Sequence, residues 1–244
     1  MFPISDHNPT LRTPVTTYAI IAINVAVWVL VQGMGRDPAL AKSVCELGLI
    51  PGEFLHILPN GFQIPLGQDM ACVVSPGVSW YAPLTSMFLH GSWFHLIGNM
   101  WFLHVFGNNV EDVMGRGRFV AYYLLCGLAA AAAQVAAGPG SPLPMVGASG
   151  AIGGVMGGYV LLYPWARIRT FVFLFFIEVP ALFMLGYWFL LQLGGTAASA
   201  SDVGGVAFWA HIGGFLAGLA LIPFFRDPEL YALHRQSTVR VHDR

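Results

Sequence analysis

Six continuously apolar segments constrain this chain more than any other feature. They cover residues 16–32, 84–106, 119–137, 145–163, 170–193 and 205–225. Each is close to the roughly 20 helical residues that cross about 30 Å of hydrocarbon. The segments are continuously apolar and not alternating, and lipid admits only helices or closed barrels, so strands are disfavoured. We therefore expect an all-α membrane protein built as a bundle of six transmembrane helices.

The composition excludes several other classes of protein. Charged residues make up 9% of the chain and hydrophobic residues 56%, whereas roughly a quarter of a soluble domain is charged. A net charge of -1 with 11 basic residues leaves no basic patch for a nucleic-acid partner. The cysteines Cys45, Cys72 and Cys126 are too few for a disulfide scaffold and lack the spacing of a zinc site.

The distribution of arginine and lysine predicts the orientation. With the N-terminus inside, nine arginines fall on the cytoplasmic side: Arg12, Arg116, Arg118, Arg167, Arg169, Arg226, Arg235, Arg240 and Arg244. Only Arg36 and Lys42 fall on the other side, so the positive-inside rule places both termini in the cytoplasm. We expect cytoplasmic tails at 1–15 and 226–244, and a membrane domain at 16–225 with an exterior first loop at about 33–83. Short tails without a transit peptide favour the inner membrane of a bacterium.

The exterior loop carries many apolar side chains, so part of it should lie in the membrane interface. Cys45 and Cys72 both fall in this loop, where an oxidising periplasm would allow one disulfide. The sequence leaves open whether they are joined. Cys126 falls in the third span and is interpreted as core packing.

Polar side chains inside the spans are costly, so each one marks a candidate functional site. A Gly/Pro-rich connection at 138–144 precedes Ser149, which indicates that the fourth helix begins near this serine. From Ser149 to the end of that span is roughly 21 Å, which is too short to cross the hydrocarbon. His211 also lies roughly 21 Å from the cytoplasmic end of the sixth span. The serine and the histidine are thus predicted at one depth.

Two more polar side chains point to the same level from the second span. His95 and Asn99 share one helical face and tilt towards the outer end of their helix. Glycines that permit close helix packing stand near the serine and the histidine, namely Gly150, Gly153, Gly214 and Gly218. His90 and His104 are interpreted as structural or interfacial residues.

Three ordered motifs carry a resemblance to a known family. They are His95-xxx-Asn99, Gly147-Ala148-Ser149-Gly150 and His211-xx-Gly214-xxx-Gly218. The chain resembles the bacterial rhomboid intramembrane serine proteases over all six predicted spans. This resemblance implies a rhomboid-like bundle with a short fourth helix that carries the nucleophile.

The resemblance also implies the chemistry. Ser149 would be the nucleophile and His211 its general base and later its general acid, while His95 and Asn99 would line the oxyanion hole. The partners would be the lipid bilayer and transmembrane protein substrates with a small residue before the scissile bond. No metal or other cofactor is expected. The fifth loop, at 194–205, would act as a mobile cap.

The sequence departs from the family pattern at Gly153, where an aromatic residue often packs beneath the histidine. Something else must therefore position His211. No carboxylate is predicted at the depth of Ser149, since Glu178 falls too far towards the cytoplasm, and this predicts a dyad and not a triad. Gln192, near the exterior end of the fifth span, could touch substrate or simply be solvated at the interface.

Other functions fit less well. A non-catalytic rhomboid-like protein that binds transmembrane helices would share the fold, but such proteins usually lack the serine or the histidine. A proton-coupled transporter would not need Ser149 at a glycine-rich helix start. A metalloprotease is disfavoured because no His-Glu-x-x-His motif occurs, and an aspartyl protease because no predicted span holds an aspartate.

Overall fold

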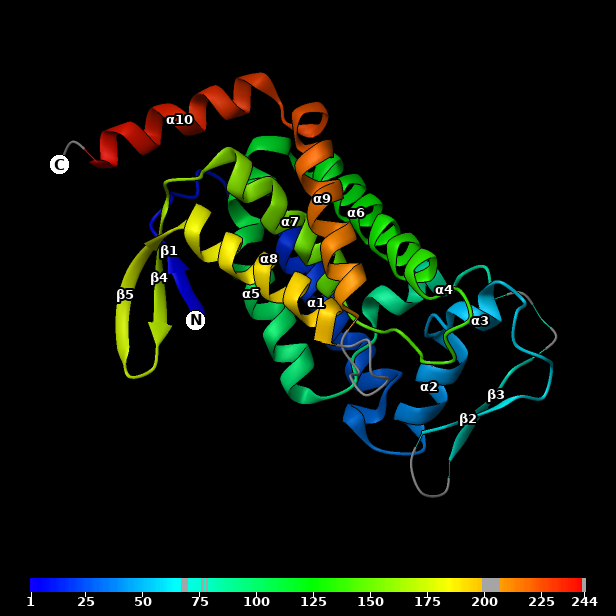
Figure 1. Ribbon diagram of the computed structural model, residues 1–244. Helices are drawn as coiled ribbons and strands as arrows, with labels where there is room; N and C mark the ends of the chain where they lie inside the picture. The colour runs from blue at the N-terminus through cyan, green and yellow to red at the C-terminus, as the bar shows by residue number, and fades with distance from the viewer. Residues whose placement is uncertain (67–69, 76, 78, 199–206, 243–244) are drawn as a thin grey trace.

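A computed structural model describes residues 1–66, 70–75, 77, 79–198 and 207–242, which are mostly helical (Figure 1). The longer helices are α1 (Val15–Leu30), α5 (Trp93–Met114), α6 (Arg116–Ala137), α7 (Ser149–Leu162), α8 (Ala181–Ala198), α9 (Phe208–Phe225) and α10 (Pro228–His242). The shorter helices are α2 (Ala39–Leu47), α3 (Pro51–Phe54) and α4 (Ala82–Thr85), with 3₁₀ turns η1 (Gly33–Gly35) and η2 (Ser86–Phe88). The strands are β1 (Phe2–Asp6), β2 (Gln63–Pro65), β3 (Ala71–Val73), β4 (Arg167–Val172) and β5 (Phe175–Pro180).

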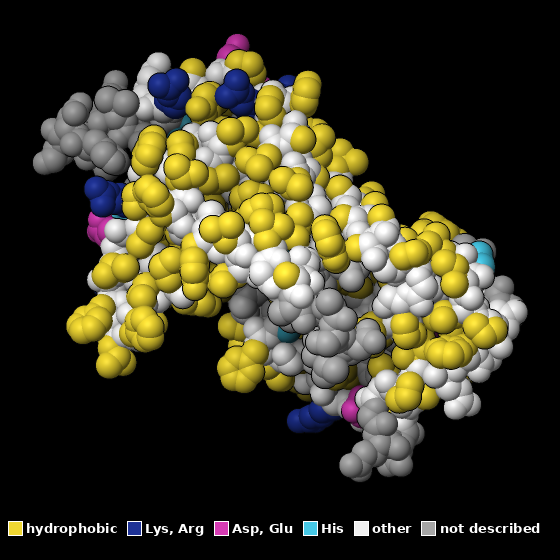
Figure 2. Space-filling model, viewed as in Figure 1, with side chains coloured by type: hydrophobic (Ala, Val, Ile, Leu, Met, Phe, Trp, Pro, Cys, Tyr) yellow, Lys and Arg dark blue, Asp and Glu magenta, His cyan; other side chains and the backbone are white. Residues whose placement is uncertain are grey.

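Two of the described helices, α6 and α9, are both long and apolar enough to cross a membrane. Three further apolar helices, α1, α7 and α8, are shorter. In Figure 2 hydrophobic side chains cover the middle of the face shown, while charged side chains lie towards its upper left and its lower edge. This distribution suits a molecule that lies across a bilayer. The number of spans stays a prediction.

Helix α7 lies at the centre of the bundle and packs against α5, α6 and α9 (Figure 1). Nearly all of its side chains are buried. The hydroxyl of Tyr122 on α6 lies 2.8 Å from the Gly154 carbonyl oxygen and 3.0 Å from that of Gly218. A single buried phenol therefore links α6, α7 and α9 at a point where unpaired carbonyls would be costly.

The second predicted span, at 84–106, begins too early and ends too soon. After α4 and η2 the chain leaves the helical path at residues 89–92, and α5 then runs from Trp93 to Met114. The Ser92 hydroxyl accepts a hydrogen bond from the His95 N–H at 3.1 Å. Because this cap satisfies one of the free N–H groups of the first turn, it fixes where the helix starts.

The fifth predicted span, at 170–193, is wrong over its first half. Strands β4 and β5 form an antiparallel hairpin, β1 pairs with the other edge of β4, and α8 begins only at Ala181. In β4 the buried Ile168 and Thr170 alternate with the exposed Arg167 and Arg169. This period of two is typical of a strand with one buried face. The fold is therefore mostly helical, with small sheets, and not all-α.

The segment predicted as an N-terminal tail packs on the bundle. Its strand β1 joins β4, and the N–H groups of Leu11 and Arg12 donate to the Asp112 carboxylate at 2.7 and 3.1 Å. The neighbouring Glu111 carboxylate accepts bonds from the backbone of Thr16 and Thr17 at the start of α1. Two adjacent acids of α5 therefore hold the first helix in place.

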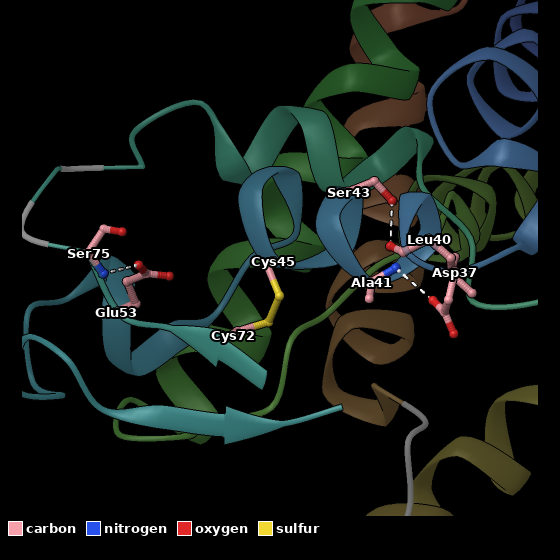
Figure 3. Close-up of a disulfide and its surroundings, with 8 residues drawn as sticks. All are labelled: Asp37, Leu40, Ala41, Ser43, Cys45, Glu53, Cys72 and Ser75. Atoms are coloured by element: carbon pink, nitrogen blue, oxygen red, sulfur yellow. Dashed lines mark hydrogen bonds between the residues drawn. A yellow bond between two sulfur atoms is a disulfide. The ribbon is translucent and has the colours of Figure 1, made fainter. Parts of the chain in front are cut away.

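The long first loop forms a small unit at the end of the molecule opposite to α10 (Figure 1). Ile50, Ile64 and Val74 are buried together there with Cys72. Cys72 of β3 is joined to Cys45 of α2 by a disulfide, as Figure 3 shows. The sequence left this pairing open, and the structure forms it.

Candidate active site

Ser149 and His211 meet near the ends of two adjacent helices. Ser149 is the first residue of α7, and His211 lies in the first turn of α9. The Ser149 Oγ and the His211 Nε2 lie 2.8 Å apart, within hydrogen-bond range. Sixty-two positions separate the two residues in sequence. The pair has the geometry that a nucleophile and its base require.

Glycines allow α7 and α9 to approach this closely. A Cβ atom at Gly214 would lie 1.9 Å from the Gly150 carbonyl oxygen, and one at Gly218 would lie 2.0 Å from that of Gly154. No larger residue fits at Gly214 or Gly218 without moving the backbone. Close contact between the helices thus depends on the absence of side chains along this seam.

The second ring nitrogen of His211, Nδ1, contacts Gln192, a residue whose role the sequence left open. His211 Nδ1 lies 2.7 Å from Gln192 Oε1 on α8, and Gln192 is only 7% exposed, so interfacial solvation does not describe it. The ring of Trp188, one turn earlier on α8, lies 5.7 Å from the His211 ring. The sequence does give a signal for Gln192, because it is a primary amide within an apolar segment, where an unpaired amide is costly.

Helix α8 also occupies the space left by Gly153. A Cβ atom at Gly153 would lie 3.2 Å from the His211 carbonyl oxygen and 3.7 Å from Cη2 of Trp188. A large side chain at this position would therefore displace the indole. The aromatic partner of the histidine therefore comes from α8 and not from α7.

His95 of α5 also lies close to Ser149. Its Nδ1 accepts a hydrogen bond from the Gly91 N–H at 3.3 Å, so the ring proton belongs on Nε2. A Cβ atom at Gly147 would lie 2.7 Å from that Nε2, and the Gly147 backbone has a positive φ of 128°. Glycine is therefore needed at this turn, both for its backbone angle and for the close approach of the imidazole.

Asn99 is buried near the same point, one turn after His95 on α5. Within the described part of the chain its Nδ2 has no hydrogen-bond partner. The same holds for both ring nitrogens of His90, whose ring packs edge-on against that of His95 at 5.1 Å. A buried amide without a partner costs free energy, so Asn99 holds a donor ready for an oxygen that is not part of the fold.

Ser149, His211, His95 and Asn99 line one cavity of about 480 Å³. Its polar members include the four predicted site residues, and part of its wall is apolar, formed by Phe94, Phe102, Ile152, Met156 and Trp188. A second cavity of about 620 Å³ lies beside the disulfide and contains none of the predicted site residues. The smaller cavity thus combines a hydroxyl, two imidazoles and an amide with a partly apolar wall.

Other predicted residues lie elsewhere. Glu178, placed by the sequence inside a span, is on β5, where its half-exposed carboxylate lies 3.5 Å from His7 Nε2. His104 is exposed and stacks on Tyr18. The predicted cap covers 194–205, of which 199–205 fall outside the described residues. Among the side chains that the structure describes, no three His, Cys, Asp or Glu are grouped to hold a metal ion.

Several known proteins are similar to this chain in sequence. Rhomboid protein 1, mitochondrial, of Saccharomyces cerevisiae is 33% identical over 209 residues, which cover 83% of this chain and 51% of that protein. Rhomboid-like protein 11, chloroplastic, of Arabidopsis thaliana is 32% identical over 149 residues, covering 59% of this chain and 52% of that protein. Rhomboid protease GluP of Bacillus subtilis is 36% identical over 156 residues, 64% of this chain and 28% of that protein.

The chain spans about half the length of the first two relatives and less of the third. These relatives come from a mitochondrion, a chloroplast and a bacterium, so they do not single out one compartment. The rhomboid domain itself matches residues 78–228, which is more than half of the chain and includes Ser149, His211, His95 and Asn99. The protein therefore belongs to the rhomboid family of integral membrane proteins.

Proposed function

We propose that this protein is an intramembrane serine endopeptidase that hydrolyses peptide bonds in or near transmembrane segments of other membrane proteins. The observation that carries the proposal is the 2.8 Å contact between Ser149 Oγ and His211 Nε2 at the wall of a cavity. The relative called a rhomboid protease supports the same class of activity.

The reaction follows from the arrangement of these atoms. His211 Nε2 takes the proton of Ser149 as Oγ attacks the scissile carbonyl, and the C–O bond forms while the carbonyl electrons move to oxygen. His211 then gives that proton to the leaving amine as the C–N bond breaks. Water repeats the sequence on the acyl enzyme and restores Ser149.

Charge on the tetrahedral oxygen needs donors that are already in place. The free Asn99 amide, the Nε2–H of His95 and the backbone N–H of Ser149 supply them. Ser149 also starts α7, whose first N–H groups have no partner within the helix and carry the positive end of its dipole. Preorganised donors of this kind stabilise the transition state more than the ground state.

The membrane sets the substrate class. We propose six spans with both termini in the cytoplasm of a bacterial cell, tails at 1–15 and 226–244, and a site that opens towards the exterior. A transmembrane helix hides its carbonyls in its own hydrogen bonds, so a substrate must unwind before Ser149 can attack. Substrates should therefore carry helix-weakening residues near their outer end and a small residue before the cleaved bond.

Cleavage of a model transmembrane substrate by the full-length purified protein tests the proposal. We expect a fluorophosphonate to label Ser149, and Ser149→Ala and His211→Ala each to lower kcat/KM by at least roughly 10³-fold. Ser5→Ala, an exposed serine on β1, is the matched control and should cleave like the wild type. Full cleavage by either site variant would refute the mechanism, and binding of the substrate helix without any cleavage would favour a non-catalytic rhomboid-like protein.

A further inference from the structure

The imidazole of His211 is held by three helices and not by two. Ser149 contacts Nε2 from α7, and Gln192 contacts Nδ1 from α8 at 2.7 Å, while the ring itself belongs to α9. The sequence predicted a dyad because no carboxylate reaches this depth. A side-chain amide stands where a serine protease with three catalytic members has an acid.

The orientation of the Gln192 amide follows from its second contact. Gln192 Nε2 donates to the Trp188 carbonyl oxygen at 3.1 Å. A carbonyl can only accept, so the NH₂ end of the amide faces Trp188 and the oxygen faces His211. An oxygen without a proton can only accept in turn, which requires the proton of the neutral imidazole to be on Nδ1.

This choice of tautomer matters for the chemistry. With the proton on Nδ1, the lone pair of Nε2 faces the Ser149 hydroxyl and can take its proton. With the proton on Nε2, the ring would offer a donor to Ser149 and could not act as its base. When His211 becomes positively charged during the attack, its Nδ1–H still points at the amide oxygen, which stabilises the charge through a hydrogen bond.

An amide suits this position in a membrane protein better than an acid. A carboxylate buried at this depth would need compensation for the loss of water around its charge, whereas an amide is neutral in every state. Gln192 reaches both of its partners from a buried position, 7% exposed. Trp188 covers the same imidazole from one turn away, with ring centroids 5.7 Å apart.

We infer that Gln192 is a positioning residue that selects the Nδ1–H tautomer of His211 and fixes the plane of its ring, so that the working unit is Ser149, His211 and Gln192. The catalytic importance of Gln192 rests on the proposed protease activity, whereas its hydrogen bonds do not. Since Gln192 is on α8, any displacement of that helix would also release the base.

Kinetics of three variants test the inference. Gln192→Leu keeps the bulk but cannot accept a hydrogen bond, and it should lower kcat roughly 10- to 100-fold with KM within about twofold of wild type. Gln192→Glu keeps an acceptor oxygen for the Nδ1–H but buries a carboxyl group, so it should recover part of that loss. Tyr187→Phe removes a hydroxyl from an exposed side chain of the same helix that does not line the cavity, and should leave kcat unchanged. Wild-type kcat in folded Gln192→Leu, or an equal loss in Gln192→Glu, would overturn the inference.

A spectroscopic measurement gives an answer that does not depend on cleavage. In protein labelled with ¹⁵N in its histidine rings, with the His211 signals assigned by their loss in His211→Asn, the wild type should show a protonated Nδ1 and an unprotonated Nε2. Gln192→Leu should shift this population towards the other tautomer. A wild-type ring protonated at Nε2 would overturn the inference even in an active enzyme. Failure of Ser149 labelling would instead refute the proposed function, whatever the tautomer.

Discussion

At the scale of single residues, two side chains of α5 bring N–H donors that have no partner among the described residues to the cavity. His95 uses Nδ1 for the Gly91 N–H and keeps Nε2–H, and Asn99 keeps its whole NH₂ group within the described structure. A buried donor without an acceptor is unfavourable, so under the proposed mechanism these groups would gain free energy when an oxyanion forms. Under that mechanism, the two side chains of α5 would stabilise the transition state.

Asn99→Ala tests this reading. Removing one oxyanion donor should lower kcat by roughly 10²-fold and leave KM nearly unchanged, because the contact forms only as charge develops on the oxygen. Steady-state cleavage in detergent measures both constants. Asn108→Ala, on the same helix but bonded to Thr10 outside the cavity, is the control and should retain activity. An Asn99→Ala enzyme with a raised KM and an unaltered kcat would assign the amide to substrate binding instead.

At the scale of elements, the distance between α7 and α9 decides whether the His211 ring reaches the Ser149 hydroxyl. The two helices touch through backbone at Gly150 and Gly214 and again at Gly154 and Gly218. Neither contact leaves room for a methyl group. A small increase in their separation would move the His211 ring away from the Ser149 hydroxyl, because each residue belongs to a different helix of this pair.

Gly214→Ala should therefore both destabilise the fold and abolish cleavage. Its new Cβ would overlap the Gly150 carbonyl oxygen, and overpacking of this kind costs about 1–3 kcal/mol. Gly186→Ala on α8 is the matched control, since a Cβ there meets no atom within 4 Å and the change should keep or raise the melting temperature. Thermal unfolding and cleavage of the two variants make the comparison. Equal melting temperatures would show that the seam tolerates a side chain.

At the scale of the whole molecule, the chain termini are tied to the bundle. The N-terminal strand β1 joins the sheet, and Tyr159 of α7 donates a hydrogen bond to the Asp6 carboxylate at 2.6 Å. At the C-terminal end, the α10 residue His234 packs its ring 4.9 Å from that of Tyr163. The helix that begins at Ser149 thus ends among contacts from both terminal segments.

Burial raises the pKa of Asp6 from 3.8 to about 7, against the opposing effect of the Tyr159 hydrogen bond. The folded protein therefore holds this proton at pH values where the unfolded chain has released it. The contribution of Asp6 to the free energy of unfolding is fully present below about pH 4 and is lost as pH rises to about 7.

We expect the melting temperature of the wild type in detergent to fall as the pH rises over this range. Asp6→Asn should not show this fall, because asparagine does not ionise. Thermal unfolding of both proteins from about pH 4 to about pH 8 measures the difference. Parallel profiles would mean that Asp6 does not titrate differently in the folded state.

The sequence predicted the membrane character and the main helices because hydrocarbon makes local composition decisive. An apolar run of sufficient length has few alternatives, and a polar residue within it needs a reason to be there. On this basis the sequence alone indicates four candidate site residues, namely Ser149, His211, His95 and Asn99. Their catalytic roles remain predictions, while their shared cavity is a feature of the structure.

Local composition does not predict the structure where contacts with residues distant in sequence decide it. The segment 170–180 is as apolar as a span, but pairing with β1 and the exposed arginines of β4 make it part of a hairpin. Cys45 and Cys72 could have stayed apart, and only the packing of α2 against β3 brings them together. Hydrogen bonding between strands and disulfide pairing depend on which segments become neighbours, which no single window of sequence contains.

Gln192 shows the same difference between what the sequence predicts and what the tertiary structure decides. Its residue type within an apolar helix marked it as unusual, but a partner could be assigned only once α8 was packed beside α9. By itself the sequence determined which polar groups the membrane would have to accommodate, because burial cost is a property of each residue. Tertiary structure alone decided which of those groups touch, because a hydrogen bond depends on fractions of an ångström between helices that are remote in the chain.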